Sequence, residues 1–72
     1  MENIEIYSEY IKLDQLLKFA GIVESGSMAK AIILDEQVRV NGDVCTMRGK
    51  KIRPGDCVAV EAIGEWHVLA SQ

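Results

Sequence analysis

A basic segment at residues 44–55 is the part of this 72-residue chain whose residue types best suit the binding of an anion. It holds half of the chain's eight basic residues and no acidic residue, so its charge is +4 while the remainder carries −7. Its cations are Arg48, Lys50, Lys51 and Arg53. Lysine and arginine supply most of the affinity of proteins for nucleic acids, through Coulomb attraction and counterion release. We interpret the segment as a phosphate-binding patch, with a solvated turn as the alternative.

A second candidate anion site lies where Ser25-Gly26-Ser27 precedes an apolar, helix-forming stretch. Either serine can cap that helix. A helix N-terminus also presents unpaired N–H groups and a partial positive charge to an anion. Lys30, one turn into the helix, adds a cation. Ordinary capping without any ligand is the alternative interpretation.

The nucleophilic and titratable side chains form no catalytic pattern. His67 lies in a strand-like stretch, where a half-exposed strand residue is commoner than a general base. No glycine-rich stretch has phosphate-loop or dinucleotide-binding spacing. Cys45 and Cys57 lack the CxxC-type spacing of a zinc site, even with His67, and are interpreted as small, buried, reduced thiols. We therefore expect no enzymatic activity, metal, cofactor or small-molecule substrate.

Length and composition indicate a single domain that includes all of residues 1–72. The hydrophobic fraction of 49% suits a packed globule. No run approaches the roughly 18 apolar residues that a membrane helix needs. The acidic, polar start also lacks the apolar core of a signal peptide. We expect a cytoplasmic protein with no membrane partner.

The cations must be positioned by the elements that the hydrophobic pattern predicts. A helix is expected at 13–20, because its leucines recur at i, i+3 and i+4 and Gly21 follows as a stop signal. Lys12 and Lys18 flank this helix, and Lys18 is off the apolar stripe, so it should reach solvent. A second, more apolar helix is expected from Ser25 or Ser27 to Asp35 or Glu36, and we expect it to be the more buried.

Strands are predicted where the hydrophobic period changes to two, at residues 3–7, 38–40, 44–46, 57–61 and 65–69. Asn41-Gly42 predicts a type I′ hairpin turn, because both positions of that turn need a positive φ. Residues 47–55 are expected to form a loop that ends in the turn Pro54-Gly55-Asp56. The predicted fold is α+β: a two-helix hairpin packed on a small, mostly antiparallel, twisted sheet. The strand at 66–69 is a candidate edge for pairing with a second copy.

The four aromatic residues do not interleave with the basic segment. Proteins that read single strands stack bases on exposed aromatic rings. The positions of Tyr7, Tyr10, Phe19 and Trp66 therefore favour recognition of folded RNA through its backbone and shape.

The combined pattern resembles the RNA-binding domain named after small-subunit ribosomal protein four, also called the alpha-L motif. The similarity covers residues 12–60 and is carried by Lys12-Leu13-Asp14, Leu17, Gly21, Ser25, Ala29, Ile32, Ile33, Val38-Arg39-Val40-Asn41-Gly42 and Pro54-Gly55-Asp56. The stretches 25–30 and 48–51 are similar to the short, stand-alone, YaaA-like bacterial members. This resemblance implies binding to structured RNA, ribosomal or transfer RNA, and a place in ribosome assembly or translation, with ribosomal particles as partners. The candidate RNA-binding residues are Lys12, Lys18, Ser25, Gly26, Ser27, Lys30, Arg48, Lys50, Lys51 and Arg53.

Two positions depart from the pattern of that family. Gly26 stands where many members have an arginine, so contacts from this turn would come from backbone N–H groups and Lys30. Glu36 stands where a glycine usually ends the second helix, and glutamate tolerates positive φ poorly, so the helix ends differently or carries strain. The pI of about 5.0 keeps a second function open, a protein-docking module without an RNA ligand.

Overall fold

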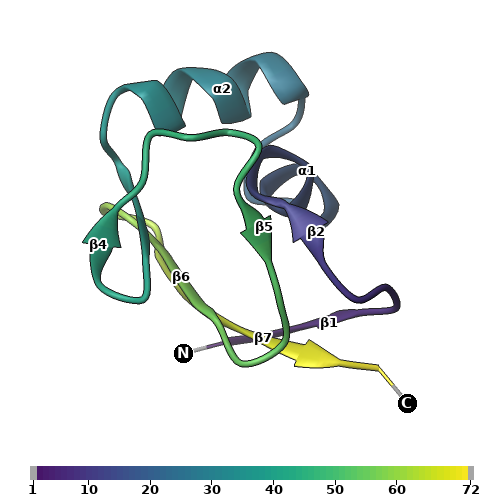
Figure 1. The fold of residues 1–72 in the computed structure, drawn as a ribbon. Helices are drawn as coiled ribbons and strands as arrows, with labels where there is room; N and C mark the ends of the chain where they lie inside the picture. Colours follow the sequence, from purple (N-terminus) through teal and green to yellow (C-terminus); the bar gives the residue numbers. More distant parts are fainter. Residues whose placement is uncertain (1, 72) are drawn as a thin grey trace.

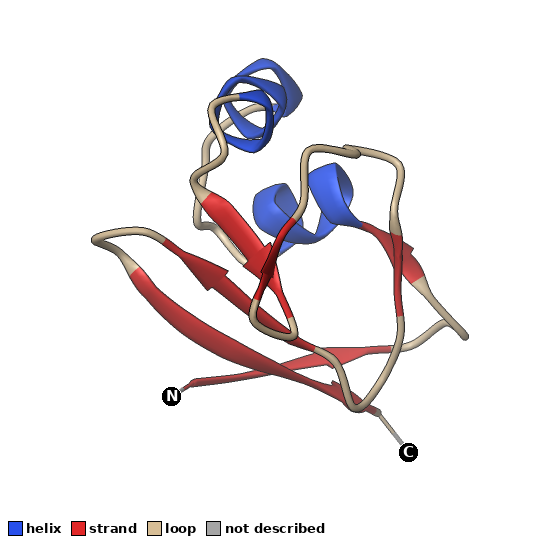
Figure 2. Ribbon diagram, turned by 60° about the vertical axis from the view of Figure 1, so that its left-hand side comes forward, coloured by secondary structure: helices blue, strands red, loops and turns tan. Residues whose placement is uncertain are grey.

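The computed structural model describes residues 2–71, and within them two helices lie over one face of a five-stranded sheet (Figures 1 and 2). The elements are β1 (Glu2–Ile6), β2 (Ile11–Lys12), α1 (Leu13–Phe19), α2 (Gly26–Leu34), β3 (Val38–Val40), β4 (Asp43–Val44), β5 (Lys51–Ile52), β6 (Cys57–Val60) and β7 (Gly64–Ala70). The sheet has the order β1-β7-β6-β3-β4, and β2 pairs with β5 in a separate ribbon. Only the β1–β7 pair of the described sheet is parallel. The predicted α+β class and mostly antiparallel sheet are therefore confirmed.

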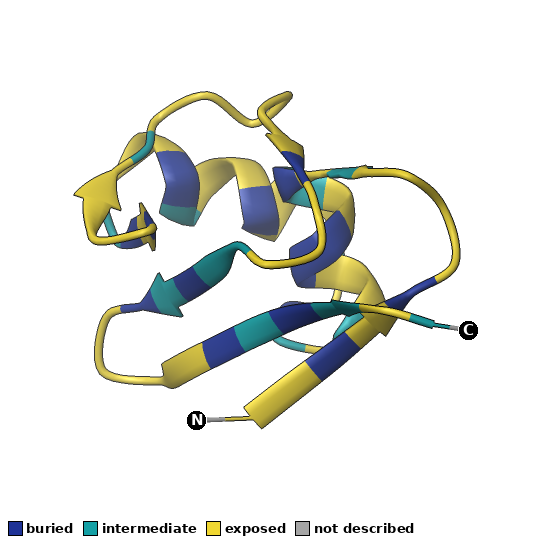
Figure 3. Ribbon diagram, turned by 60° about the horizontal axis from the view of Figure 1, so that its bottom comes forward, coloured by how far each residue is buried: buried dark blue, intermediate teal, exposed yellow. Residues whose placement is uncertain are grey.

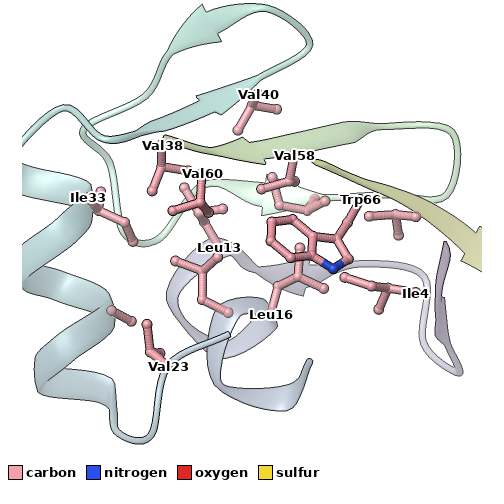
Figure 4. Close-up of a cluster of buried hydrophobic side chains, with 14 of the residues drawn as sticks. Ile4, Leu13, Leu16, Val23, Ile33, Val38, Val40, Val58, Val60 and Trp66 are labelled. Atoms are coloured by element: carbon pink, nitrogen blue, oxygen red, sulfur yellow. The ribbon is translucent and has the colours of Figure 1, made fainter. Parts of the chain in front are cut away.

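Alternating apolar residues of the strands form the floor of the core. Along β3 and β6, and in the middle of β7, every second residue is buried, which is the period-two pattern of a sheet with one covered face (Figure 3). Trp66 lies among Ile4, Leu16 and Val58 (Figure 4). Each fully buried side chain of this size contributes about 1.5–3 kcal/mol to stability. This core holds the helices, and the ribbon beside them, in fixed positions.

The first helix, not the second, is the more buried, so that prediction was wrong. Leu13, Leu16 and Leu17 have no exposed surface, because α1 contacts α2, β2 and β5. Only Ala29 and Ile33 of α2 are buried. The outer surface of α2 remains open, with Met28 and Leu34 48% and 58% exposed. No helix within residues 2–71 combines the length and the apolar character required to cross a membrane.

Both helices end with the same hydrogen-bond pattern, although only one of them ends at a glycine. After α1, Gly21 has a φ of +75°, its N–H donates to Lys18 O, and the next N–H donates to Leu17 O. After α2, Glu36 has a φ of +61° and the equivalent bonds reach Ile33 O and Ile32 O. This is the Schellman arrangement, which normally uses glycine. Of the two outcomes expected for Glu36, the structure shows the strained one.

The Asn41-Gly42 turn is confirmed, but the strand after it is shorter than predicted. Asn41 and Gly42 have φ values of +52° and +90°, and Val40 pairs with Asp43 across the turn. The return strand β4 ends at Val44, so Thr46 lies outside the sheet. The N–H of Cys45 still donates to the carbonyl oxygen of Val38, and beyond Cys45 the chain leaves the sheet.

The last strand is not an edge of the sheet, so the proposed pairing of residues 66–69 with a second copy was wrong. β7 lies between β6 and β1, with Val68 opposite Ile4 in the parallel pair. Both of its edges are therefore occupied, and β1 and β4 form the edges of the sheet in the described chain. A parallel partner from the other end of the chain leaves no hairpin signal in the sequence, because no short turn connects the two strands.

Candidate nucleic-acid interface

The ribbon β2–β5 brings cations from two distant parts of the chain together. Ile11 lies opposite Ile52, and Lys12 lies opposite Lys51. Side chains alternate between the two faces of a strand, so the buried side chain of Ile52 anchors the ribbon in the core while both lysines are exposed. The prediction that residues 47–55 form only a loop was therefore wrong at this point. The buried side chain of Ile52 explains why a strand interrupts the basic segment.

The N-terminus of α1 is closed by carbonyl groups of the basic segment. The N–H of Leu13 donates to Lys50 O (2.9 Å), and the N–H of Asp14 donates to Arg48 O (3.0 Å). The first N–H groups of a helix have no partner within the helix, and these carbonyls supply one. Lys12, the N-cap residue, makes no side-chain cap. These bonds fix the backbone of the basic segment beside Lys12.

Tyr10 lies against the basic segment, so the prediction that no aromatic residue interleaves with it was wrong. Lys51 Nζ is 4.9 Å from the centroid of the Tyr10 ring, and Arg53 Cζ is 5.8 Å from it. Both distances are within the range of a cation–π interaction. The antiparallel register explains the contact, because continuing the pairs 11–52 and 12–51 by one step places Tyr10 opposite Arg53. The contact could not be predicted from the sequence alone, because it depends on the pairing of β2 with β5.

A hydrogen-bond network fixes the far end of the basic segment to the hairpin turn. Asp56 accepts from the N–H of Arg53 (2.8 Å) and from the side-chain amide of Asn41 (3.0 Å). Asn41 Oδ1 accepts from the N–H of Cys57 (2.9 Å). Burial raises the pKa of Asp56. The hydrogen bonds from the Arg53 N–H and the Asn41 side chain, together with the charges of Lys50 and Arg53, outweigh this effect and lower the pKa below 3.8. The carboxylate therefore stays charged and holds the turn at neutral pH.

Five of the ten predicted residues are grouped around this ribbon, and their charged groups are available to a ligand. We call them the basic patch: Lys12, Arg48, Lys50, Lys51 and Arg53. All five side chains are exposed. None of the five side chains takes part in the hydrogen bonds found within residues 2–71, although the backbone N–H of Arg53 donates to Asp56. Their polar contacts are thus left to solvent or to an anion.

The other five predicted residues belong to the helix pair. Ser25 caps α2 by accepting from the N–H of Met28 (3.2 Å), which selects it over Ser27 as the N-cap. Lys18 is exposed, as expected, and lies in the last turn of α1, at the opposite end from Lys12. Gly26, Ser27 and Lys30 are exposed in the first turns of α2. Within the described chain, no hydrogen bond connects these residues to the basic patch.

The two cysteines and the histidine lie in or next to the sheet. Cys45 and Cys57 are free thiols and only half-buried, so the expectation of buried cysteines was too strong. His67 is a half-buried strand residue, as expected, and lies opposite Cys57 in the β6–β7 pair. Residues 2–71 contain no group of three or more His, Cys, Asp or Glu side chains that could hold a metal ion.

Comparison with known proteins gives two findings. A family model described as the S4 domain matches residues 4–68. The probable ribosome maturation protein RlbA of Bacillus subtilis (strain 168) is 39% identical over 66 residues, which is 92% of this chain and 93% of the relative. The similarity therefore extends over nearly the full length of both chains and includes the ribbon, the helix pair and the sheet.

Proposed function

This chain belongs to the S4 domain family, and from that premise we propose that it is a non-catalytic module that binds folded ribosomal RNA during ribosome maturation. The family match supports RNA as the ligand class. The name of the Bacillus subtilis relative supports a role at the maturing ribosome. The residues that we assign to RNA binding are the basic patch and, beside the helix pair, Lys18, Ser25, Gly26, Ser27 and Lys30.

The observation that carries this proposal is the basic patch on a ribbon that the buried side chain of Ile52 anchors in the core. Residues directly opposite each other on two strands have Cβ atoms about 5 Å apart, so Lys12 and Lys51 project from neighbouring positions on one face of the ribbon. Phosphate oxygens accept hydrogen bonds from such groups, and RNA duplexes are recognised mainly through phosphates, 2′-hydroxyls and shape. The patch therefore suits the backbone of folded RNA better than it suits unstacked bases.

The charge of the rest of the chain orients this binding. Outside the basic segment the chain carries −7, and acidic residues such as Glu61, directly after β6, and Glu65, in β7, belong to the main sheet and not to the ribbon. Beyond about 10 Å charges are screened at 0.1 M salt, so the local field and not the net charge of −3 determines where a polyanion binds. The excess of acidic residues outside the basic segment disfavours RNA there and leaves the basic patch as the proposed docking face.

A titration of the protein against a ribosomal RNA fragment at two salt concentrations, with transfer RNA and duplex DNA as comparisons, tests the proposal. We expect ribosomal RNA to bind most tightly and its affinity to fall steeply with salt, because each neutralised phosphate adds about 0.9 to the slope of log K against log salt. Lys50→Glu/Lys51→Glu should weaken binding to all RNA sequences and reduce this slope. Lys51→Glu alone should have a smaller effect of the same kind, and Arg39→Glu, exposed on β3 outside the patch, is the charge-matched control for this single reversal. Unchanged RNA affinity in the double variant would contradict the assignment of the patch.

A protein-docking module is the second candidate function, and the open surface of α2 favours it. Met28 and Leu34 are exposed there, and apolar side chains on a helix surface suit a protein partner. This function predicts capture of a ribosomal protein that is insensitive to salt, with no retention of RNA. Substitution of both residues by serine should abolish that capture and leave any RNA affinity intact.

A further inference from the structure

We infer that Tyr10 is a positioning residue of the RNA site, whose ring holds the charged ends of Lys51 and Arg53 ready for neighbouring phosphates. This inference rests on the proposed function. It adds a residue that contributes no charge and that the sequence pattern excludes. It also assigns the ring a role that differs from the usual stacking of an aromatic side chain on a base.

The geometry places one ring within cation–π distance of two cations of the patch. Lys51 Nζ lies 4.9 Å and Arg53 Cζ 5.8 Å from the centroid of Tyr10, whose residue is 37% exposed. The negative face of an aromatic ring attracts both groups. A base that stacked on that face would have to displace a cation that the RNA needs for its phosphates. The occupied ring therefore favours positioning of cations over stacking.

The ring also offsets a repulsion that the fold creates. Lys12 lies directly opposite Lys51, and like charges in such cross-strand positions repel each other. Without a partner, Lys51 would turn away from Lys12 and populate many rotamers. Contact with Tyr10 restricts these rotamers, while an ammonium group, with three N–H donors, keeps donors free for a phosphate.

This mechanism predicts a distinctive result when the ring is removed. Without the ring, two long side chains must be ordered when RNA binds, so the loss of preorganisation should weaken RNA binding about fivefold or more. No cation is lost, so the slope of affinity against salt should not change. Loss of Lys51 itself should lower both the affinity and the slope.

The experiment compares two polyanions, a ribosomal RNA fragment and long-chain inorganic polyphosphate, which has phosphates but no bases. The variants are Tyr10→Leu, which removes the ring, and Tyr10→Phe, which keeps it. We expect Tyr10→Leu to weaken binding to both polyanions by a similar factor at an unchanged salt slope, and Tyr10→Phe to bind as the wild type does. Thermal melts confirm that each variant folds, and Tyr10→Gln replaces the leucine variant if that variant does not fold.

A double-variant comparison tests whether Tyr10 acts through its cation. Tyr10→Leu should have a smaller effect on affinity in a Lys51→Gln background than in the wild type, because the side chain that the ring positions is already absent. Equal effects in both backgrounds would overturn the inference.

Three other outcomes would also distinguish the positioning role of Tyr10 from other roles and from the proposed function. If Tyr10→Leu weakens RNA binding but not polyphosphate binding, the ring stacks on a base and the inference is wrong. If it weakens neither, Tyr10 has no role in binding, although the proposed function stands. If the wild type binds polyphosphate in a Tyr10-dependent way but binds no RNA, the positioning role stands and the proposed function falls.

Discussion

The side-chain amide of Asn41 donates a 3.0 Å hydrogen bond to the carboxylate of Asp56, which ties the hairpin turn to the end of the basic segment. The same carboxylate accepts from the N–H of Arg53. Two short motifs that look unrelated in the sequence, Val40-Asn41-Gly42 and Pro54-Gly55-Asp56, are thus two halves of one structural unit. Its role is to fix where the basic segment re-enters the sheet.

Replacing Asp56 by Asn should lower the stability of the protein in a pH-dependent way. The folded-state pKa of Asp56 is lowered relative to the unfolded chain, so its charged form stabilises the fold at pH values above about 4. This contribution is lost as the pH falls through the lowered pKa. The difference in unfolding free energy between wild type and Asp56→Asn, measured in urea from pH 7 to pH 2.5, should therefore shrink at acidic pH. A difference that grows on acidification would contradict the assignment.

Replacing Glu36 by Gly should stabilise the protein by about 0.5–1 kcal/mol. A residue with a side chain costs about 1–2 kcal/mol in the left-handed region, and glycine avoids this cost while losing part of the gain to greater backbone freedom in the unfolded chain. The converse change at the matched helix end, Gly21→Ala, should destabilise by a similar amount. Chemical denaturation measures both. No gain from Glu36→Gly would mean that the glutamate side chain makes a compensating contribution.

Replacing Lys12 by Gln should strengthen the fold slightly and weaken RNA binding. Removal of a like charge opposite Lys51 relieves a repulsion of about 0.2–1 kcal/mol at low salt. The same change removes one phosphate contact and should reduce the salt slope by up to about 0.9. Arg39→Gln, outside the patch, serves as the control for a lost positive charge. Melting curves and RNA titrations on the same samples separate the two effects, and a loss of stability in Lys12→Gln would contradict the repulsion.

Replacing Ile52 by Ala should cost about 2–5 kcal/mol of stability, because the side chain is completely buried where the ribbon meets the core. The matched change at an exposed position, Ile63→Ala, should alter stability by less than about 0.5 kcal/mol. Urea unfolding of the two variants gives the comparison. Similar values for both would show that the ribbon is not anchored through Ile52.

The sequence predicted those features that local rules determine. The period of Leu13, Leu16 and Leu17 identified α1, and the Asn41-Gly42 dipeptide identified the hairpin. Each depends on residues close together in the chain. The same holds for the basic segment, which is visible as an uninterrupted stretch without acidic residues.

Features that depend on contacts between distant segments could not be predicted. The pairing of Lys12 with Lys51, the contact of Tyr10 with Arg53, and the parallel partner of β7 all join residues from different parts of the chain. The greater burial of α1 has the same origin. The hydrophobicity of α2 indicated an apolar helix, but only the packing shows that α1 is surrounded on several sides while α2 is covered on one.

The parallel β1–β7 pair determines when this protein can fold during its synthesis. In the described chain β1 has no strand partner other than β7, so Glu2–Ile6 emerges from the ribosome long before the strand that it needs exists. The helix pair and the β3–β4 hairpin can form from neighbouring residues as they appear, whereas the sheet closes only after Gly64–Ala70 has been made. Completion of the sheet is thus a late step, because the core lacks Trp66 and Val68 until β7 has been made.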